Sequence, residues 1–204
     1  MDYTLLAIWV VMWFTAMGLM NYLFSIGKSS YYANPISNTV WYLSCSGLAM
    51  LLFSQYVVSY FSVVTKEHLV FLILVLSGWF LIPKLYKNDH YNKNERICYQ
   101  TVKSSEIICQ QLLFLAGFLV FSQEWYLFAV LFFIVHLPAP LVISKKFGLF
   151  LALASFPGGL IFAYLHSLGI NGFIFAMAVH FAFYAILPLV LGSKLLPDIK
   201  VLRR

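Results

Sequence analysis

The chain has few charged residues. Asp, Glu, Lys and Arg together make up only 10% of its 204 residues, whereas an ordinary soluble domain has about 25%. Hydrophobic residues make up 62%. This composition excludes a soluble globular domain, and at about 20 residues per membrane crossing the length leaves no room for one beside a helix bundle. We therefore expect a single all-α integral membrane domain over residues 1–204, embedded in the lipid bilayer.

Several common functional signals are also missing. The three cysteines, Cys45, Cys98 and Cys109, have neither Cys-x-x-Cys nor Cys/His ligand spacing, so they indicate neither a disulfide framework nor a zinc site. No glycine-rich phosphate loop, dinucleotide fingerprint or nucleic-acid-binding module is present. No cleavable signal peptide is evident, because Asp2 rather than a basic segment opens the chain. We expect no cofactor, no metal ion and no nucleic-acid partner.

Long apolar runs predict a polytopic bundle of about seven transmembrane helices. They cover residues 4–26, 38–61, 69–86, 100–122, 125–143, 148–167 and 171–192. One long polar connection, from Lys84 to Lys103, separates the third span from the fourth. Residues 1–99 then hold three spans and this loop, residues 100–192 hold four spans, and residues 193–204 form a basic tail.

The basic residues predict the orientation of the bundle. Lys and Arg number 13, against 7 Asp and Glu, which gives a net charge of +6. With seven spans, every basic residue except Lys66 falls on the side opposite the N-terminus. Basic residues gather in the cytoplasmic connections of membrane proteins. We therefore expect the N-terminus outside and the C-terminus in the cytoplasm, with the chain in a cell membrane of the bacterial cytoplasmic type.

Few ionisable side chains lie inside the predicted spans. Glu106 lies in the fourth span, His136 in the fifth and His180 in the seventh. Such residues are costly in hydrocarbon, so they usually face the interior of a bundle and have a function there. At a rise of about 1.5 Å per residue, all three lie in the cytoplasmic half of the membrane or near its midplane.

Each of these residues has a partner four positions away on the same helix face, and the three pairs are Glu106 with Gln110, Phe132 with His136, and His180 with Tyr184. One glutamate and two histidines that face each other could activate water in two ways. The glutamate could act as a general base while the imidazoles position the water and stabilise an oxyanion, or all three could hold a metal ion. Alternatively, each residue only makes an interhelical hydrogen bond.

These residues resemble motifs of the CPBP family, the intramembrane glutamic endopeptidases that include the type II CAAX prenyl proteases and the bacteriocin-processing Abi proteins. The family motifs are EExxxR on one helix, FxxxH on the next, and HxxxN or HxxxD two helices on. Phe132 and His136 match FxxxH in full, and Leu137 and Pro138 follow as they often do in the family. The resemblance covers about residues 100–192, including the block that ends at His180.

The first and last motifs differ from the family pattern. Aligned to EExxxR, Ser105 stands at the first glutamate, Glu106 at the second and Gln110 at the arginine. In an alternative alignment Glu106 stands at the first glutamate and Gln111 at the arginine. Tyr184 replaces the final Asn or Asp, and a phenol also donates hydrogen bonds.

The resemblance implies that the chain hydrolyses a peptide bond in a membrane-associated polypeptide. Glu106, helped by His136, would deprotonate the attacking water, His180 with Tyr184 would stabilise the oxyanion, and Gln110 would orient Glu106. Two other classes stay open. The three substitutions favour a catalytically inactive family member that binds or regulates another membrane protein, and buried Glu and His residues also form the proton relays of small transporters.

Overall fold

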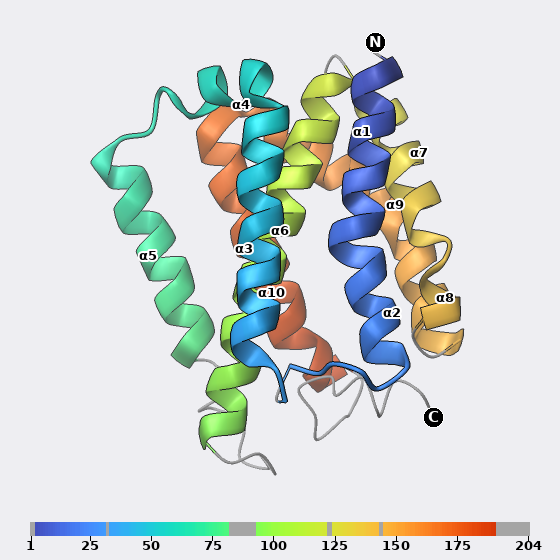
Figure 1. Ribbon diagram of the computed structural model, residues 1–204. Coiled ribbons are helices and arrows are strands. Elements are labelled where there is room, and N and C mark those ends of the chain that lie inside the picture. Colours follow the sequence, from blue (N-terminus) through green and yellow to red (C-terminus); the bar gives the residue numbers. More distant parts are fainter. Residues whose placement is uncertain (1–2, 32, 82–92, 122–123, 143–144, 191–204) are drawn as a thin grey trace.

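The computed structural model describes residues 3–31, 33–81, 93–121, 124–142 and 145–190. Helices are the only regular elements in these ranges, so the prediction of an all-α fold is confirmed. Most of the helices run side by side along one direction (Figure 1).

The first predicted span is one continuous helix with a π-helical turn inside it. It consists of α1 (Tyr3–Trp13), the π-helical turn η1 (Phe14–Gly18) and α2 (Leu19–Ser25). Together they form a candidate membrane span of 23 residues, Tyr3–Ser25.

The second predicted span, 38–61, is wrong as a single straight helix. The structure has α3 (Pro35–Leu52) and α4 (Ser54–Phe61), with a bend of 98° between them. The backbone N–H of Phe53 still bonds to Ala49, while its carbonyl already accepts bonds from Tyr56 and Val57. The Phe53 and Val57 side chains are fully buried, so packing into the core stabilises the bend.

The central helix is α6 (Lys93–Val120), whose candidate span Ile97–Val120 is 72% buried within the bundle. It starts before the predicted residue 100, so the polar connection predicted for 84–103 is wrong from Lys93 onward. Beside it lies α5 (Lys66–Leu81) (Figure 1), while positions 82–86 of the third predicted span lie outside the described residues. Trp79 and Gln100 join the two helices, because each side chain donates a hydrogen bond to the other's carbonyl.

The C-terminal half contains α7 (Trp125–His136), the short α8 (Ala139–Val142), α9 (Lys145–Ser167) and α10 (Gly169–Val190). Gly169 has φ +71°, which allows the tight turn between α9 and α10. Gly159 lets α9 approach α7 closely, since a Cβ there would lie 2.9 Å from Ala129 Cα. The predicted basic tail, 193–204, lies outside the described residues.

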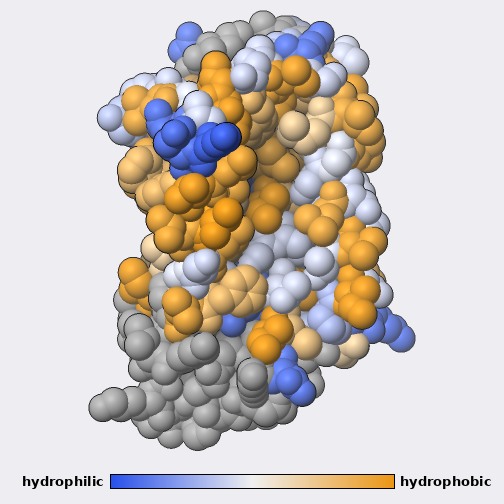
Figure 2. Space-filling view, turned by 90° about the vertical axis from the view of Figure 1, so that its left-hand side faces the viewer, coloured by the Kyte–Doolittle hydropathy of each residue, from blue (hydrophilic) through white to orange (hydrophobic). Residues whose placement is uncertain are grey.

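The length and composition of the described helices suggest a membrane protein. Four are long and apolar enough to cross a membrane, and the bent pair α3 and α4 makes a fifth if it counts as one span. Many large apolar side chains are exposed on outer helix faces, which suits contact with lipid. Figure 2 shows one such face, where hydrophobic residues cover much of the surface and the most hydrophilic ones lie mainly toward the two ends.

The other two predicted spans fall short of this length. The helix α5 has 16 residues, and the apolar stretch Trp125–Leu141 belongs to the shorter class of 10 to 17 residues. Seven crossings and the orientation of the termini therefore stay predictions, while four or five candidate membrane-spanning helices are established for the described part of the chain.

Candidate functional site

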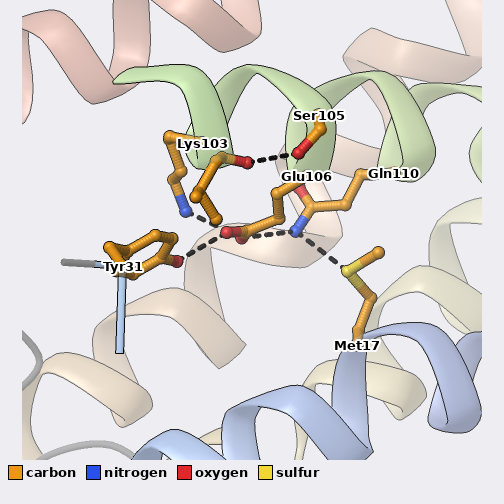
Figure 3. Close-up of polar contacts among 7 residues, drawn as sticks. Met17, Tyr31, Lys103, Ser105, Glu106 and Gln110 are labelled. Atoms are coloured by element: carbon orange, nitrogen blue, oxygen red, sulfur yellow. Dashed lines mark hydrogen bonds and ion pairs between the residues drawn. The ribbon is translucent and has the colours of Figure 1, made fainter. Parts of the chain in front are cut away.

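Glu106 is the centre of a buried polar cluster on α6. Its Oε1 accepts hydrogen bonds from Lys103 Nζ at 2.7 Å and from Gln110 Nε2 at 3.1 Å. Its Oε2 accepts a bond from the Tyr31 hydroxyl at 2.5 Å. Both charged side chains are less than a tenth exposed, and Figure 3 shows the donors converging on the carboxylate. We call Tyr31, Lys103, Glu106 and Gln110 the glutamate cluster.

Lys103 corrects the sequence analysis. It was predicted to end a cytoplasmic connection, yet it lies inside the candidate span of α6, is buried, and forms a salt bridge with Glu106. Three positions separate the two residues, so they share one helix face. Its ammonium also lies 3.7 Å from the centre of the Tyr184 ring, a distance that favours a cation–π interaction.

Ser105, at the position of the family's first glutamate, takes no part in this cluster. Its hydroxyl donates to the Val102 carbonyl of its own helix at 2.7 Å, and Figure 3 shows the side chain apart from the bonds that converge on Glu106. A serine that bonds its own helix in this way satisfies its hydroxyl locally.

His136 is the last residue of α7, and its orientation is fixed by its own helix. Its Nδ1 lies 2.6 Å from the Phe132 carbonyl oxygen. Because a carbonyl only accepts, Nδ1 carries a proton, and in the neutral ring Nε2 then holds the lone pair. The rings of Trp13 and Phe132 lie 5.4 Å and 4.5 Å away, between centroids.

His180, in the middle of α10, has the opposite tautomer. Its Nδ1 lies 2.8 Å from Gln111 Nε2. An amide nitrogen only donates, so Nδ1 accepts this bond and the proton of the neutral ring sits on Nε2. The Tyr184 ring stacks on the imidazole at 5.4 Å, between centroids.

Both histidines line one cavity of about 240 Å³ between α6, α7, α9 and α10. Gln110 and Tyr184 line it as well, so four polar side chains that the sequence analysis singled out meet at this cavity. The rest of the lining is mostly apolar or aromatic. Such a cavity, mostly apolar with a few convergent polar groups, is the usual form of a ligand or active site.

Glu106 is not among the residues that line the cavity. It contacts the lining through its hydrogen bond with Gln110, and its partner Lys103 lies over the ring of Tyr184, another lining residue. The predicted site residues therefore form two adjacent groups. One is the glutamate cluster, whose carboxylate is hydrogen-bonded within the protein, and the other is the cavity lined by His136 and His180, which we call the histidine cavity. Gln110 belongs to both of them.

Sequence reasoning missed Tyr31 and Lys103 as partners of Glu106, and it named Gln111 only at the arginine position of the alternative alignment and not as the partner of His180. Tyr31 lies in the connection between α2 and α3, and 75 positions separate it from Glu106. Gln111 is 69 positions from His180. No local pattern links such residues, but the charge of Lys103 at three positions from Glu106 was a usable signal for an ion pair.

The metal-binding arrangement that the sequence left open does not form in the described part of the chain. No group of three His, Cys, Asp or Glu side chains comes together there in a way that could hold a metal ion. Glu106 is instead occupied by Lys103, Tyr31 and Gln110.

Comparisons of the chain with protein-family models, with curated proteins and with solved structures find no match.

Proposed function

We propose that the protein is an intramembrane hydrolase that cleaves a peptide bond in a membrane-associated polypeptide, as a divergent relative of the CPBP endopeptidases. The observation that carries the proposal is that His136 and His180 line one cavity, and that a hydrogen bond at Nδ1 holds each ring. His136 offers an Nε2 lone pair and His180 offers an Nε2 proton, each fixed by a hydrogen bond at Nδ1. One ring is thus prepared to accept a proton and the other to donate a hydrogen bond.

The proposed reaction uses these two groups in turn. His136 Nε2 takes a proton from a water molecule as the water oxygen attacks the carbonyl carbon of the scissile bond. The new oxyanion receives hydrogen bonds from His180 Nε2 and from the Tyr184 hydroxyl. When the carbon–nitrogen bond breaks, His136 gives the proton to the leaving amine, and the histidine returns to its starting state.

In this proposal Glu106 is a positioning residue rather than the base that the family resemblance implies. Three donors already occupy its carboxylate oxygens, and the side chain lies outside the cavity lining. Its hydrogen bond fixes Gln110, which does line the cavity. A general base that takes a proton from water needs a lone pair within reach of that water, and His136 lines the cavity whereas Glu106 does not.

We further propose seven crossings, with the N-terminus outside and the C-terminus in the cytoplasm of a bacterial cell. The positive-inside pattern supports this topology. The burial of Lys103 removes one residue from that pattern and leaves the asymmetry otherwise unchanged. Single cysteines placed at Ser62 and at Lys28 are expected to react with a membrane-impermeant thiol reagent added outside intact cells only at position 62. Labelling at position 28 instead would reverse the orientation.

The hydrolase proposal is tested by comparing the termini of membrane proteins by mass spectrometry. Source cells carry the native protein, His136→Ala, His180→Ala or the control His68→Ala, at matched membrane levels. His68 lies at the start of α5 and bonds Asn171, away from the cavity. We expect the same terminus to be lost in both cavity variants and retained in the control. If no terminus differs, the protein does not act as a protease in these cells.

A non-catalytic binding protein is the second candidate. The salt bridge between Glu106 and Lys103 favours it, because a neutralised carboxylate gives the site a structural role in place of a chemical one. Deletion of the whole protein would then give the cells a phenotype, while cells that carry His136→Ala or His180→Ala would keep the native phenotype.

A further inference from the structure

The cavity is open on the side of α9 because the residues on this face of the helix are small. Ala154, Ser155 and Gly158 line it from this helix, at spacings of three and four that place them on one face. A Cβ added at Gly158 would meet only Phe132, at 3.9 Å, so this wall lies against open space. Across the space, α10 contributes Val179, His180, Phe183 and Tyr184.

Two residues that line the cavity, one on α9 and one on α10, are also exposed at the outer surface. Ile161 on α9 and Val179 on α10 both line the cavity, and they are 52% and 44% exposed. Gly158 stands at the middle of the 20-residue candidate span Gly148–Ser167. A group that enters between these two helices therefore comes from the hydrocarbon core of a membrane, where charged and unpaired polar groups are costly.

The volume of the cavity limits what it holds. An apolar protein cavity of about 150 Å³ binds one benzene molecule. A volume of about 240 Å³ therefore suits one large apolar side chain, such as leucine, methionine or phenylalanine. The walls match this chemistry, since Phe114, Phe132 and Phe162 line the space.

We propose that this cavity is a specificity pocket for one large apolar side chain of a membrane-embedded polypeptide segment that enters between α9 and α10. The inference rests on the proposed function and names its substrate class. With the side chain in the pocket, the adjoining backbone lies beside the polar lining groups Gln110, His136 and His180. The protein would then recognise its substrate inside the bilayer by one large apolar residue of the substrate segment.

The test is photo-cross-linking with the full-length protein in phospholipid nanodiscs. The probe is a synthetic single-span peptide of leucine and alanine with one diazirine-bearing leucine at its centre. Cross-links are expected on α9 and α10 at the cavity lining. Gly158→Leu fills the pocket and is expected to lower the yield by about tenfold, the loss that accompanies one unburied apolar side chain.

Gly47→Leu is the matched control. Gly47 is exposed on α3, and a Cβ there also meets nothing within 4 Å, so the same substitution leaves the cavity intact. Equal yields from the native protein and Gly158→Leu, or cross-links spread evenly over the outer helix faces, would overturn the proposed pocket. An excess of the same peptide with alanine in place of the central leucine is expected to compete poorly.

The two proposals fail in different ways. Specific cross-linking without cleavage of any peptide leaves the pocket in place and removes the hydrolase. Cleavage that Gly158→Leu does not slow keeps the hydrolase and removes the pocket.

Discussion

The glutamate cluster and the histidine cavity lie side by side, yet they differ in one physical respect. In the cluster the carboxylate oxygens of Glu106 are already occupied, by Lys103, Tyr31 and Gln110. In the cavity each histidine uses only Nδ1 to hold its ring and keeps Nε2 for another partner. Polar groups whose hydrogen-bonding atoms are all paired within the protein stabilise a fold. Groups that are held in one orientation and keep one atom available for a substrate are suited to catalysis. Under the proposed function, this difference gives Glu106 a structural role and gives the histidines the chemical one.

The largest expected effect comes from removing a cavity histidine. His136→Ala removes the proposed base and is expected to lower the cleavage rate by about 10²–10⁴-fold, the usual contribution of general base catalysis. The unfolding temperature of the purified protein should stay close to that of the native chain. His68→Ala serves as the control and should keep the native rate. An unchanged rate in His136→Ala would remove the histidine from the reaction.

Breaking the salt bridge should act on stability. Lys103→Met leaves Glu106 buried without its cation, which is expected to cost about 3–5 kcal/mol of unfolding free energy. Denaturation of the purified protein in detergent measures this loss. Lys66→Met, at an exposed position, is the matched control. The double variant Lys103→Met with Glu106→Gln should recover most of the loss, and failure to recover would show that the pair is not one unit.

Removal of a single donor from the cluster should have a smaller effect. Tyr31→Phe deletes the hydroxyl that bonds Glu106 Oε2, and a hydrogen bond to a charged group contributes about 1.5–3 kcal/mol. The same denaturation experiment measures the loss of unfolding free energy, and Tyr22→Phe, at an exposed position, is the control. A loss equal to that of the control would mean that the loop carrying Tyr31 does not stabilise the cluster.

The smallest effect is expected at the position of the family's first glutamate. Ser105→Ala removes only a hydrogen bond to the Val102 carbonyl within the same helix, so we expect a stability change of about 1 kcal/mol or less and a native cleavage rate. A large drop in rate would place Ser105 in the reaction and contradict its local role.

The sequence predicts much of the helical architecture because long apolar runs have few alternatives in a membrane. It also predicts the residues four apart, such as Glu106 with Gln110 and His136 with Phe132, since helical spacing is a local property. Both of these pairs are in contact in the structure.

What the sequence misses depends on tertiary packing. The bend at Phe53 has neither proline nor glycine as a signal, and it follows from how Phe53 and Val57 pack in the core. Lys103 resembles a loop residue by its charge, and only the buried carboxylate of Glu106 explains its place inside a span. The tautomer of His180 depends on Gln111, on another helix, so no local pattern indicates it.

The decisive measurement is the cleavage rate of the double variant Lys103→Met with Glu106→Gln, measured beside His136→Ala on the same substrate. The double variant keeps a side chain of similar shape at each position but has no carboxylate. If the histidines carry the reaction and Glu106 only supports Gln110, the double variant retains a rate near the native one while His136→Ala loses it. If the double variant is as inactive as His136→Ala, Glu106 is the base and the division between the two regions is wrong.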